Sequence, residues 1–327
     1  MQKDNSIGGT SSFGANKPKR KKKKLSFWKR LKHDLKVNGG LYLLCIPAIF
    51  YVVIFCYVPM TGIVIAFQNY SVTKGIFGSK WVGFENFKMF FEYYYFWDII
   101  FTTLKFSVVS LVFGFPLPII ISLILNSIHS KFKDIFRVTS YIPNFLSIVV
   151  VVAMLMQMLD ESNGIINKLI EWVGGKPIAF MTEPEYFLMV YVMSGLWQGA
   201  GWGTIIYTSA LSSVDPQLYE AAKMDGANKF QILRYVDFPE IIPTVVVSLI
   251  LAVGGLMSVG FEKVYLMQNE MNMLENDVIS TYAYRTGLLN QEWGFGTAVG
   301  LFNSVINFIL FAAVNRIARK TSGYSIW

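Results

Sequence analysis

Long apolar stretches without a charged side chain recur along the chain. They cover residues 37–73, 106–130, 138–159, 186–214, 241–261 and 293–315. A helix of about 20 apolar residues crosses a bilayer and satisfies its own backbone polar groups in lipid. Because the stretches are continuous rather than alternating, they do not resemble the strands of a membrane β-barrel. The pattern predicts an all-α membrane protein with six transmembrane helices, at about 40–68, 98–127, 137–159, 186–213, 240–267 and 294–316.

A second prediction concerns the segment between predicted spans four and five, which is polar and strongly patterned. Asp215 precedes a proline, the usual start of a helix, and the segment 217–224 favours a helix. Gly226 permits a positive φ and predicts a break. Asn228 predicts the cap of a second short helix that runs to about Val236, and Pro239 marks the entry to predicted span five. The segment 215–240 is therefore predicted to be a helix-turn-helix that is too short and too polar to span lipid.

The composition also indicates a membrane protein, and the distribution of charge predicts its orientation in the membrane. The chain is 54% apolar and 15% charged, whereas soluble domains carry about 25% charged residues. Residues 17–36 hold eleven Lys or Arg and one acid, so the positive-inside rule places this end in the cytoplasm. Six spans then return the C-terminus to the same side. The basic run adjoins a span, which favours attraction to anionic membrane lipid and argues against nucleic acid.

These patterns predict three regions. Residues 1–36 form a basic, largely disordered cytoplasmic tail with a short interfacial helix, and residues 37–317 form the six-span domain. Residues 318–327 form a cytoplasmic C-terminal tail. The two histidines and two cysteines make no cluster with metal spacing, and no nucleophile motif is present. The sequence therefore predicts no metal and no catalytic residue, and a membrane-bound enzyme lacks any acid pair within the spans.

The polar hairpin resembles the cytoplasmic EAA loop of the permease subunits of ABC importers. Its motif consists of Glu220-Ala221-Ala222 and Asp225-Gly226-Ala227, with prolines at 239 and 243. Residues 81–87 (WVGFENF) and 261–267 (FEKVYLM) resemble segments of sugar permeases. The C-terminal SGYSIW at 322–327 resembles the branch that handles oligosaccharides and polysaccharide fragments.

The resemblance implies a type I ABC importer permease in the bacterial cytoplasmic membrane that forms half of a sugar pore. Its partners would be a second permease, which we expect to be a different homologous chain, two ATP-binding subunits and an extracytoplasmic sugar-binding protein. The residues that contact an ATP-binding subunit would be Glu220, Ala221, Ala222, Asp225, Gly226 and Ala227. No phosphate-binding loop occurs in this chain. We therefore expect no cofactor here, with ATP and Mg in the partner ATPase subunits.

The substrate path is predicted from polar and aromatic residues within or beside the spans, because such groups bind sugars. The candidates are Gln157, Trp197, Gln198, Tyr207, Glu262, Tyr265, Asn303 and Asn307. For the residues within the spans the alternative is hydrogen bonding between packed helices, and for Glu262 and Tyr265 it is a solvated rim. Lys105 either snorkels to the interface or faces the path. A stand-alone channel or secondary transporter with a purely structural hairpin is the alternative function.

Overall fold

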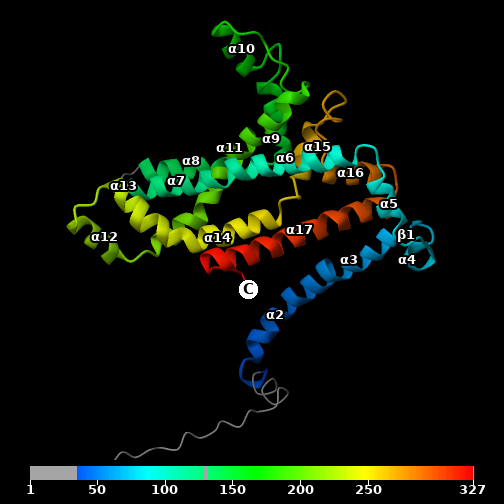
Figure 1. Ribbon diagram of the computed structural model, residues 1–327, viewed down its shortest axis with the longest axis horizontal. Helices are drawn as coiled ribbons and strands as arrows, with labels where there is room; N and C mark the ends of the chain where they lie inside the picture. The colour runs from blue at the N-terminus through cyan, green and yellow to red at the C-terminus, as the bar shows by residue number, and fades with distance from the viewer. Residues whose placement is uncertain (1–34, 129–131, 327) are drawn as a thin grey trace, which may run out of the picture. The chain divides into compact units, whose positions relative to one another are not determined.

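The computed structural model describes residues 35–128 and 132–326 (Figure 1). The predicted basic tail and its interfacial helix lie almost wholly outside the described residues. The described residues form helices, joined by loops, and one two-stranded sheet. They divide into two compact units between Thr61 and Gly62.

The N-terminal unit is one apolar helical run. It comprises α2 (Gly39–Val52), a π turn (Val53–Tyr57) and α3 (Val58–Met60), and the helix continues to Phe67. The prolines at 47 and 59 favour a bend or break, yet the helix passes through both. The π turn just before Pro59 shifts the backbone hydrogen bonds, so that the Val58 N–H bonds to the Val53 carbonyl. Cys45 and Cys56 on this helix are free and exposed.

The second unit begins at Gly62, within the 3₁₀ helix Thr61–Phe67, and a small sheet follows. Strand β1 (Gln68–Asn69) pairs antiparallel with β2 (Lys80–Trp81), and α4 (Gly75–Gly78) lies between them in sequence. Asn86, in α5 (Glu85–Phe91), donates hydrogen bonds to the carbonyls of Ala66 and Gln68, at 2.8 and 3.1 Å. This buried amide fixes α5 against the start of the sheet.

Helices make up nearly all the rest of the second unit. They are α6 (Phe96–Gly114), α7 (Pro116–Ser127), α8 (Phe132–Tyr141), α9 (Ile148–Met158), α10 (Ile165–Trp172), α11 (Pro184–Ser212), α12 (Pro216–Met224), α13 (Lys229–Ile232), α14 (Phe238–Gly254), α15 (Phe261–Met267), α16 (Ile279–Tyr284) and α17 (Trp293–Ser322). A 3₁₀ turn (Ile142–Phe145) follows α8, and π turns follow α13 (Leu233–Asp237) and α16 (Arg285–Leu289).

Four helical runs of the described residues are long and apolar enough to cross a membrane. These are Gly39–Phe67, Phe96–Ser127, Lys229–Gly254 and Trp293–Ser322. A fifth is possible if Lys133–Phe145 and Ile148–Met158, which meet at 98°, count as one broken span. Helix α11 is continuous over 29 residues. It is not among these runs, because glycine and polar side chains lower its mean hydropathy. Length and apolar composition therefore support four or five spans, against six predicted.

The helix of predicted span five ends earlier than expected. The sequence predicts one helix over 240–267, but α14 stops at Gly254 and α15 starts only at Phe261. Two adjacent glycines, Gly254 and Gly255, stand where the helix stops, and glycine is unfavourable in a helix interior. The segment between the two helices is a non-helical linker in which Met257 and Val259 are buried.

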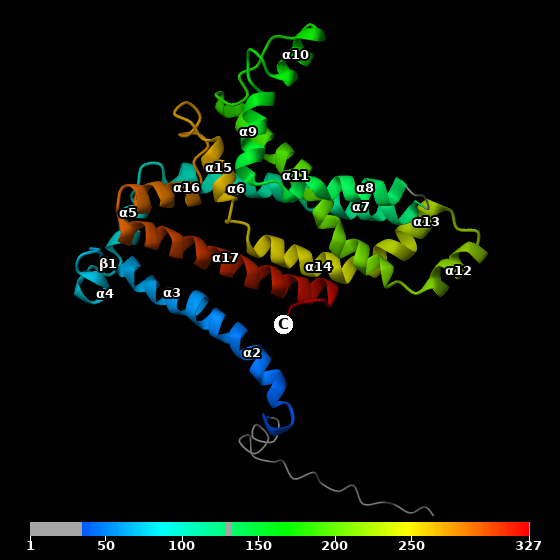
Figure 2. The same ribbon diagram turned by 180° about the vertical axis from the view of Figure 1, so that it is seen from behind.

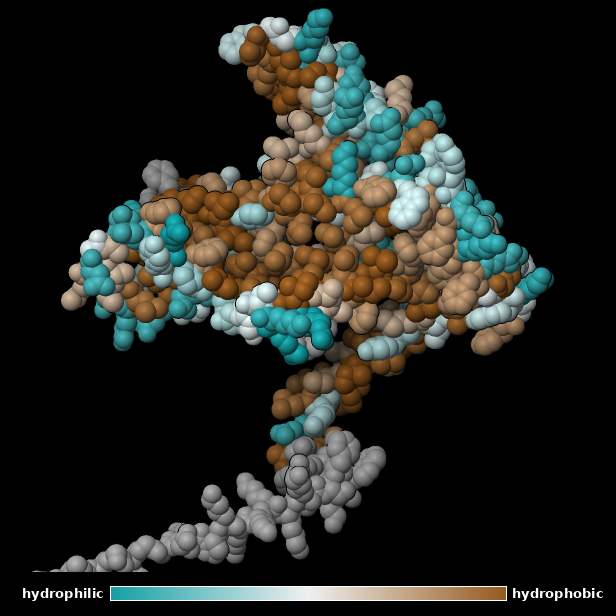
Figure 3. Space-filling view, viewed as in Figure 1, coloured by the Kyte–Doolittle hydropathy of each residue, from teal (hydrophilic) through white to brown (hydrophobic). Residues whose placement is uncertain are grey.

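Pairwise helix packing builds the second unit. Helix α7 packs against α11, α6 against α11, and α14 against α17; both views show α14 and α17 side by side (Figures 1 and 2). Hydrophobic side chains cover the middle of this face of the helices, whereas hydrophilic ones gather near its ends (Figure 3). Such a surface is the one expected of a protein surrounded by lipid.

Buried clusters fix the helices that surround the functional region. One cluster centres on Phe90, which contacts Phe96 edge to face at 4.9 Å and also packs on Phe295, joining α5, α6 and α17. A second joins Phe106 of α6, Phe187 of α11 and Val264 of α15. Because it ties α15 to the two long helices, this second cluster holds the end of the 255–260 linker in place.

Candidate functional site

The polar hairpin begins with the helix that the sequence predicts. The Asp215 carboxylate accepts a hydrogen bond of 2.9 Å from the Gln217 N–H, and Pro216 occupies the first turn of α12. This N-cap satisfies a backbone donor that the helix itself cannot. The predicted start of the helix at Asp215 is confirmed.

The turn of the hairpin depends on Gly226, whose φ is +76°. The Gly226 N–H donates to the Lys223 carbonyl and the Ala227 N–H to the Ala222 carbonyl, at 3.1 and 2.9 Å. This is a Schellman motif, in which the left-handed residue is usually glycine. Beyond it, Asn228 and Gln231 form a capping box at the start of α13.

The hairpin presents an exposed surface of mixed character. Of the predicted coupling residues, Glu220, Ala221, Asp225 and Gly226 are exposed, and Ala222 and Ala227 are half-buried. Apolar side chains lie exposed among them: Met224 is 89% exposed and Phe230 67%. An exposed apolar surface with a polar rim is typical of a protein interface.

A buried hydrogen-bond cluster anchors the hairpin to the helical bundle. Oδ1 of Asp237, which is 2% exposed, accepts hydrogen bonds from the Tyr219 hydroxyl at 2.6 Å and from Nδ2 of Asn126 at 3.1 Å. Tyr219 belongs to α12, Asn126 to α7, and Asp237 to the π turn before α14. Burial, together with the bond to Asp237, raises the pKa of Tyr219 to about 12, so the hydroxyl remains a donor at physiological pH.

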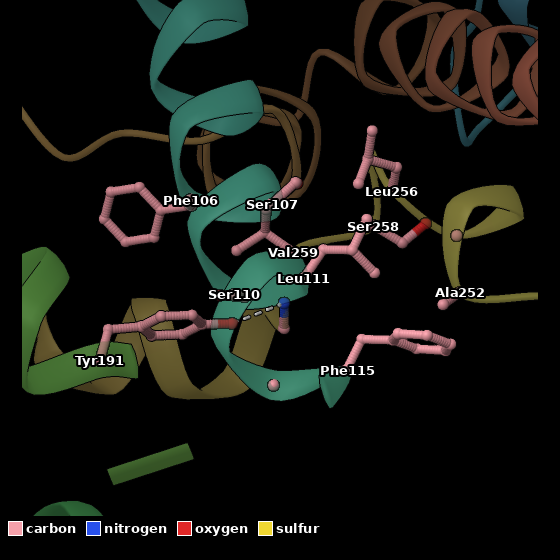
Figure 4. Close-up of a pocket in the computed structure, with 13 residues that line it drawn as sticks. Phe106, Ser107, Ser110, Leu111, Phe115, Tyr191, Ala252, Leu256, Ser258 and Val259 are labelled. Carbon is pink, nitrogen blue, oxygen red and sulfur yellow. Dashed lines mark hydrogen bonds between the residues drawn. The ribbon is translucent and has the colours of Figure 1, made fainter. Parts of the chain in front are cut away.

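Two adjoining cavities, of about 350 and 440 Å³, lie between α6, α11 and the 252–263 segment. Ser110, Gly114 and Tyr191 line both. Figure 4 shows Ser107 and Ser110 on α6 and Tyr191 reaching from α11 to the linker, where its hydroxyl accepts a 3.3 Å hydrogen bond from the Gly260 N–H. Below, "the cavity" means these two spaces together.

Asn307 of α17 holds the linker that forms one wall of the cavity. Its Oδ1 accepts from the Met257 N–H at 2.9 Å, and its Nδ2 donates to the Ser258 hydroxyl at 3.0 Å. Because the linker is not helical, its backbone polar groups have no partners within a helix and need side chains such as Asn307. Oδ1 of Asn303, one turn earlier, is buried without a hydrogen-bond partner.

Lys263 contributes a buried charge to the cavity wall. Its side chain is 7% exposed, and Nζ donates to the Tyr191 carbonyl at 2.8 Å and lies 4.8 Å from the centre of the Tyr191 ring. A Cβ on Gly195 of α11 would lie 3.4 Å from Nζ, an ordinary van der Waals contact. Glycine at this position therefore places no side chain against the ammonium.

The other predicted path residues are dispersed. Gln198 lines the cavity and donates to the Leu146 carbonyl at 3.1 Å. Trp197 lines a separate apolar cavity with residues of α9, and Gln157 is exposed on α9. Tyr207 is 4% exposed, in a core cluster with Ile119 and Ile241; it does not line the cavity.

The remaining candidates lie at α15. Glu262 is exposed, and Tyr265 packs on Phe261 and Tyr284 with ring centres 5.5 and 5.1 Å apart. Lys105 is exposed and is not among the residues that line the cavity.

Sequence reasoning did not single out Ser107, Ser110, Ser258 or Lys263 as site residues. The usable signal for Lys263 was its place directly after Glu262, where the charge-free run 241–261 ends, in a segment where only Glu262 and Tyr265 are predicted candidates. Within residues 35–128 and 132–326, no group of three or more His, Cys, Asp or Glu side chains is placed to hold a metal ion.

Comparisons with known proteins show the family to which the chain belongs. Residues 114–323 match the model of the family "binding-protein-dependent transport system inner membrane component". The chain is 40% identical to protein LplB of Bacillus subtilis over 287 residues, 88% of this chain and 90% of LplB. It is 41% identical over 293 residues to YteP of the same organism, a polygalacturonan/rhamnogalacturonan transport system permease protein, covering 89% of this chain and 91% of YteP.

A solved structure has the same fold. A chain of a bacterial ABC transporter involved in the import of the acidic polysaccharide alginate superposes with a TM-score of 0.82 at 35% identity, over 90% of this chain and 99% of that one. Together with the family match, this likeness shows that the chain belongs to the inner membrane components of binding-protein-dependent transport systems, the permease subunits of ABC importers.

Proposed function

We propose that the chain is the permease subunit of an ABC importer for oligosaccharides or polysaccharide fragments and forms half of the translocation pore. The observation that carries the proposal is the capped hairpin 215–240, which is anchored to the bundle at Tyr219 and otherwise presented outward. The polysaccharide substrates in the names of YteP and the alginate transporter support the substrate class.

The proposed topology has six spans, with α11 and the bent α8–α9 pair crossing the membrane beside the four apolar helical runs. Both termini and the hairpin then face the cytoplasm, in keeping with the basic residues near each end of the chain. A companion permease would cover apolar and glycine-rich faces that a lone chain leaves exposed to lipid.

The proposed coupling surface consists of Glu220, Ala221, Ala222, Asp225, Gly226 and Ala227. Small residues allow close backbone approach, Glu220 offers a carboxylate to a basic partner, and the exposed Met224 and Phe230 supply apolar area. The proposed partners are a second, homologous permease, two ATP-binding subunits that carry ATP and Mg, and an extracytoplasmic sugar-binding protein. The path residues are proposed to be Gln198 and Asn307 at the cavity, with Gln157, Trp197, Tyr207, Asn303, Glu262 and Tyr265 as weaker candidates.

The test is reconstitution of the complete importer in proteoliposomes, with uptake of labelled oligosaccharides and ATP hydrolysis measured together. Glu220→Lys should abolish binding-protein-stimulated ATPase activity and uptake while the chain still folds and inserts. Asp134→Lys is the matched control: Asp134 is also an exposed acid on the proposed cytoplasmic side, and its carboxylate only approaches Arg137, at 3.9 Å.

The alternative is a channel or secondary transporter in which the hairpin is only structural. It predicts uptake in proteoliposomes that lack the ATP-binding subunits, and normal uptake by Glu220→Lys. Either result would refute the ABC importer function.

A further inference from the structure

Lys263 is the one charged side chain among the described residues that line the cavity. Ser107 and Ser110 of α6 also line it, and their buried hydroxyl oxygens have no hydrogen-bond partner among the described residues. A buried cation and unpaired hydroxyls in the walls of one cavity are costly, because buried polar groups normally have partners. The arrangement therefore calls for a ligand.

The contacts of Lys263 leave its charge without an opposite charge. An ammonium group has three N–H donors, and one of them bonds to the Tyr191 carbonyl. The ring of Tyr191 supplies a cation–π contact. The ion pairs between described residues all involve other side chains, and no Asp or Glu lines the cavity.

A purely structural role explains the bond between α15 and α11 but not the charge. An uncharged donor such as glutamine satisfies a backbone carbonyl without the cost of burying an ion. Gly195, which lines the cavity with Lys263, also carries no side chain that would contact Nζ. Both observations indicate that the ammonium meets something that enters the cavity.

We propose that Lys263 binds a carboxylate of the transported sugar, so that the substrate is an oligosaccharide containing uronic acid residues. The serine hydroxyls at 107, 110 and 258 then contact its ring hydroxyls, and the Tyr191 ring packs nearby. This inference rests on the proposed function and specifies its substrate class. It makes Lys263 a specificity residue for acidic over neutral sugar.

The experiment measures equilibrium binding to the purified importer complex in detergent, without the binding protein. The probes are trigalacturonate and trimannuronate, each compared with its carboxyl-reduced neutral counterpart. The wild type should bind at least one uronate trimer about tenfold or more tightly than the neutral form, the gain expected from one charge-assisted hydrogen bond. Lys263→Met should abolish this preference without weakening the neutral trimer, and Lys263→Arg should keep most of it.

Lys105→Met is the matched control, since it removes one exposed positive charge from the same region, and it should keep the preference. The inference is overturned if the wild type shows no preference or binds no trimer, or if Lys263→Met keeps the preference. It is also overturned if Lys263→Met separates the two permease subunits, because the carboxylate would then belong to the partner. ATP-driven uptake of neutral oligosaccharides by the wild type, without preference for uronates, would refute the inference and leave the proposed function intact.

Discussion

The Tyr219 hydroxyl donates a 2.6 Å hydrogen bond to Oδ1 of Asp237, and this bond joins the first helix of the hairpin to the base of α14. Asn126 adds the end of α7 to the same carboxylate. The cluster therefore fixes α12 to the end of α7 and to the base of α14.

Tyr219→Phe tests this connection. It removes one donor from a buried carboxylate and should cost about 1–3 kcal/mol of unfolding free energy, measured as a lower denaturation midpoint, together with weaker stimulation of ATP hydrolysis by the binding protein. Tyr235→Phe is the matched control, because Tyr235 is 70% exposed. Equal effects of the two substitutions would contradict the anchoring role.

The same tyrosine predicts an alkaline dependence. Its pKa is raised to about 12, above the value of about 10 in the unfolded chain. The contribution to stability is thus complete below pH 10 and is lost as the pH rises from 10 toward 12. The absorbance difference at 295 nm between wild type and Tyr219→Phe should show this ionisation only well above pH 10; a transition at or below pH 10 would contradict the burial of the hydroxyl.

Within the chain itself, only the backbone conformation limits substitution of Gly226. A Cβ there meets nothing within 4 Å, but φ is +76°. Gly226→Val should therefore distort the turn and reduce ATP-coupled uptake strongly, since left-handed geometry costs an L-residue about 1–2 kcal/mol. Gly226→Asn, which tolerates this geometry better, should retain more uptake. If both variants lose uptake equally, closeness to the ATP-binding subunit rather than φ is decisive.

Asn307 and Asn303 provide a matched pair on one helix face. Asn307→Ala leaves the Met257 N–H without its partner and should lower stability by about 1–3 kcal/mol and weaken substrate binding, because the linker forms a cavity wall. Asn303→Ala removes a carbonyl oxygen that has no partner and should cost less. Denaturation midpoints and the KM for uptake measure both; a larger effect of Asn303→Ala would be inconsistent with the role of the linker.

The Asp277 carboxylate pairs with Arg285 and also accepts a 2.7 Å hydrogen bond from the Thr281 hydroxyl. Arg285→Met leaves this carboxylate, which is 9% exposed, without its counter-charge and should cost about 3 kcal/mol of unfolding free energy. Arg137→Met, which removes the long 3.9 Å contact with the exposed Asp134, should cost less than about 1 kcal/mol.

The pH dependence of this region follows from Asp277. Burial raises the pKa of its carboxyl, and Thr281 and Arg285 offset this only in part. The folded state therefore holds a proton more tightly than the unfolded state, and the favourable contribution of protonation is lost as the pH rises through the folded pKa. The denaturation midpoint of wild type relative to Asp277→Asn should rise on acidification; a constant difference would contradict the raised pKa.

Local chemistry explains which elements could be predicted. Asp215, Gly226 and Asn228 act on backbone groups within a few residues, so the hairpin follows from their order in the chain. The long apolar runs similarly predict helices. The break at Gly254 was missed because continuous apolarity outweighed a glycine pair, and the 98° bend between α8 and α9 was missed because the 138–159 run contains no charge to mark it.

The sequence by itself determined a helical membrane protein with a capped polar hairpin, since both depend on composition and on contacts between near neighbours. Tertiary structure alone decided that Tyr219 meets Asp237 and Asn126, that Lys263 contacts Tyr191, and that both line one cavity with Ser110. These residues come from helices that only packing brings together. A buried charge or hydroxyl acquires its role from its surroundings, and those surroundings form only when α6, α11 and α15 are packed.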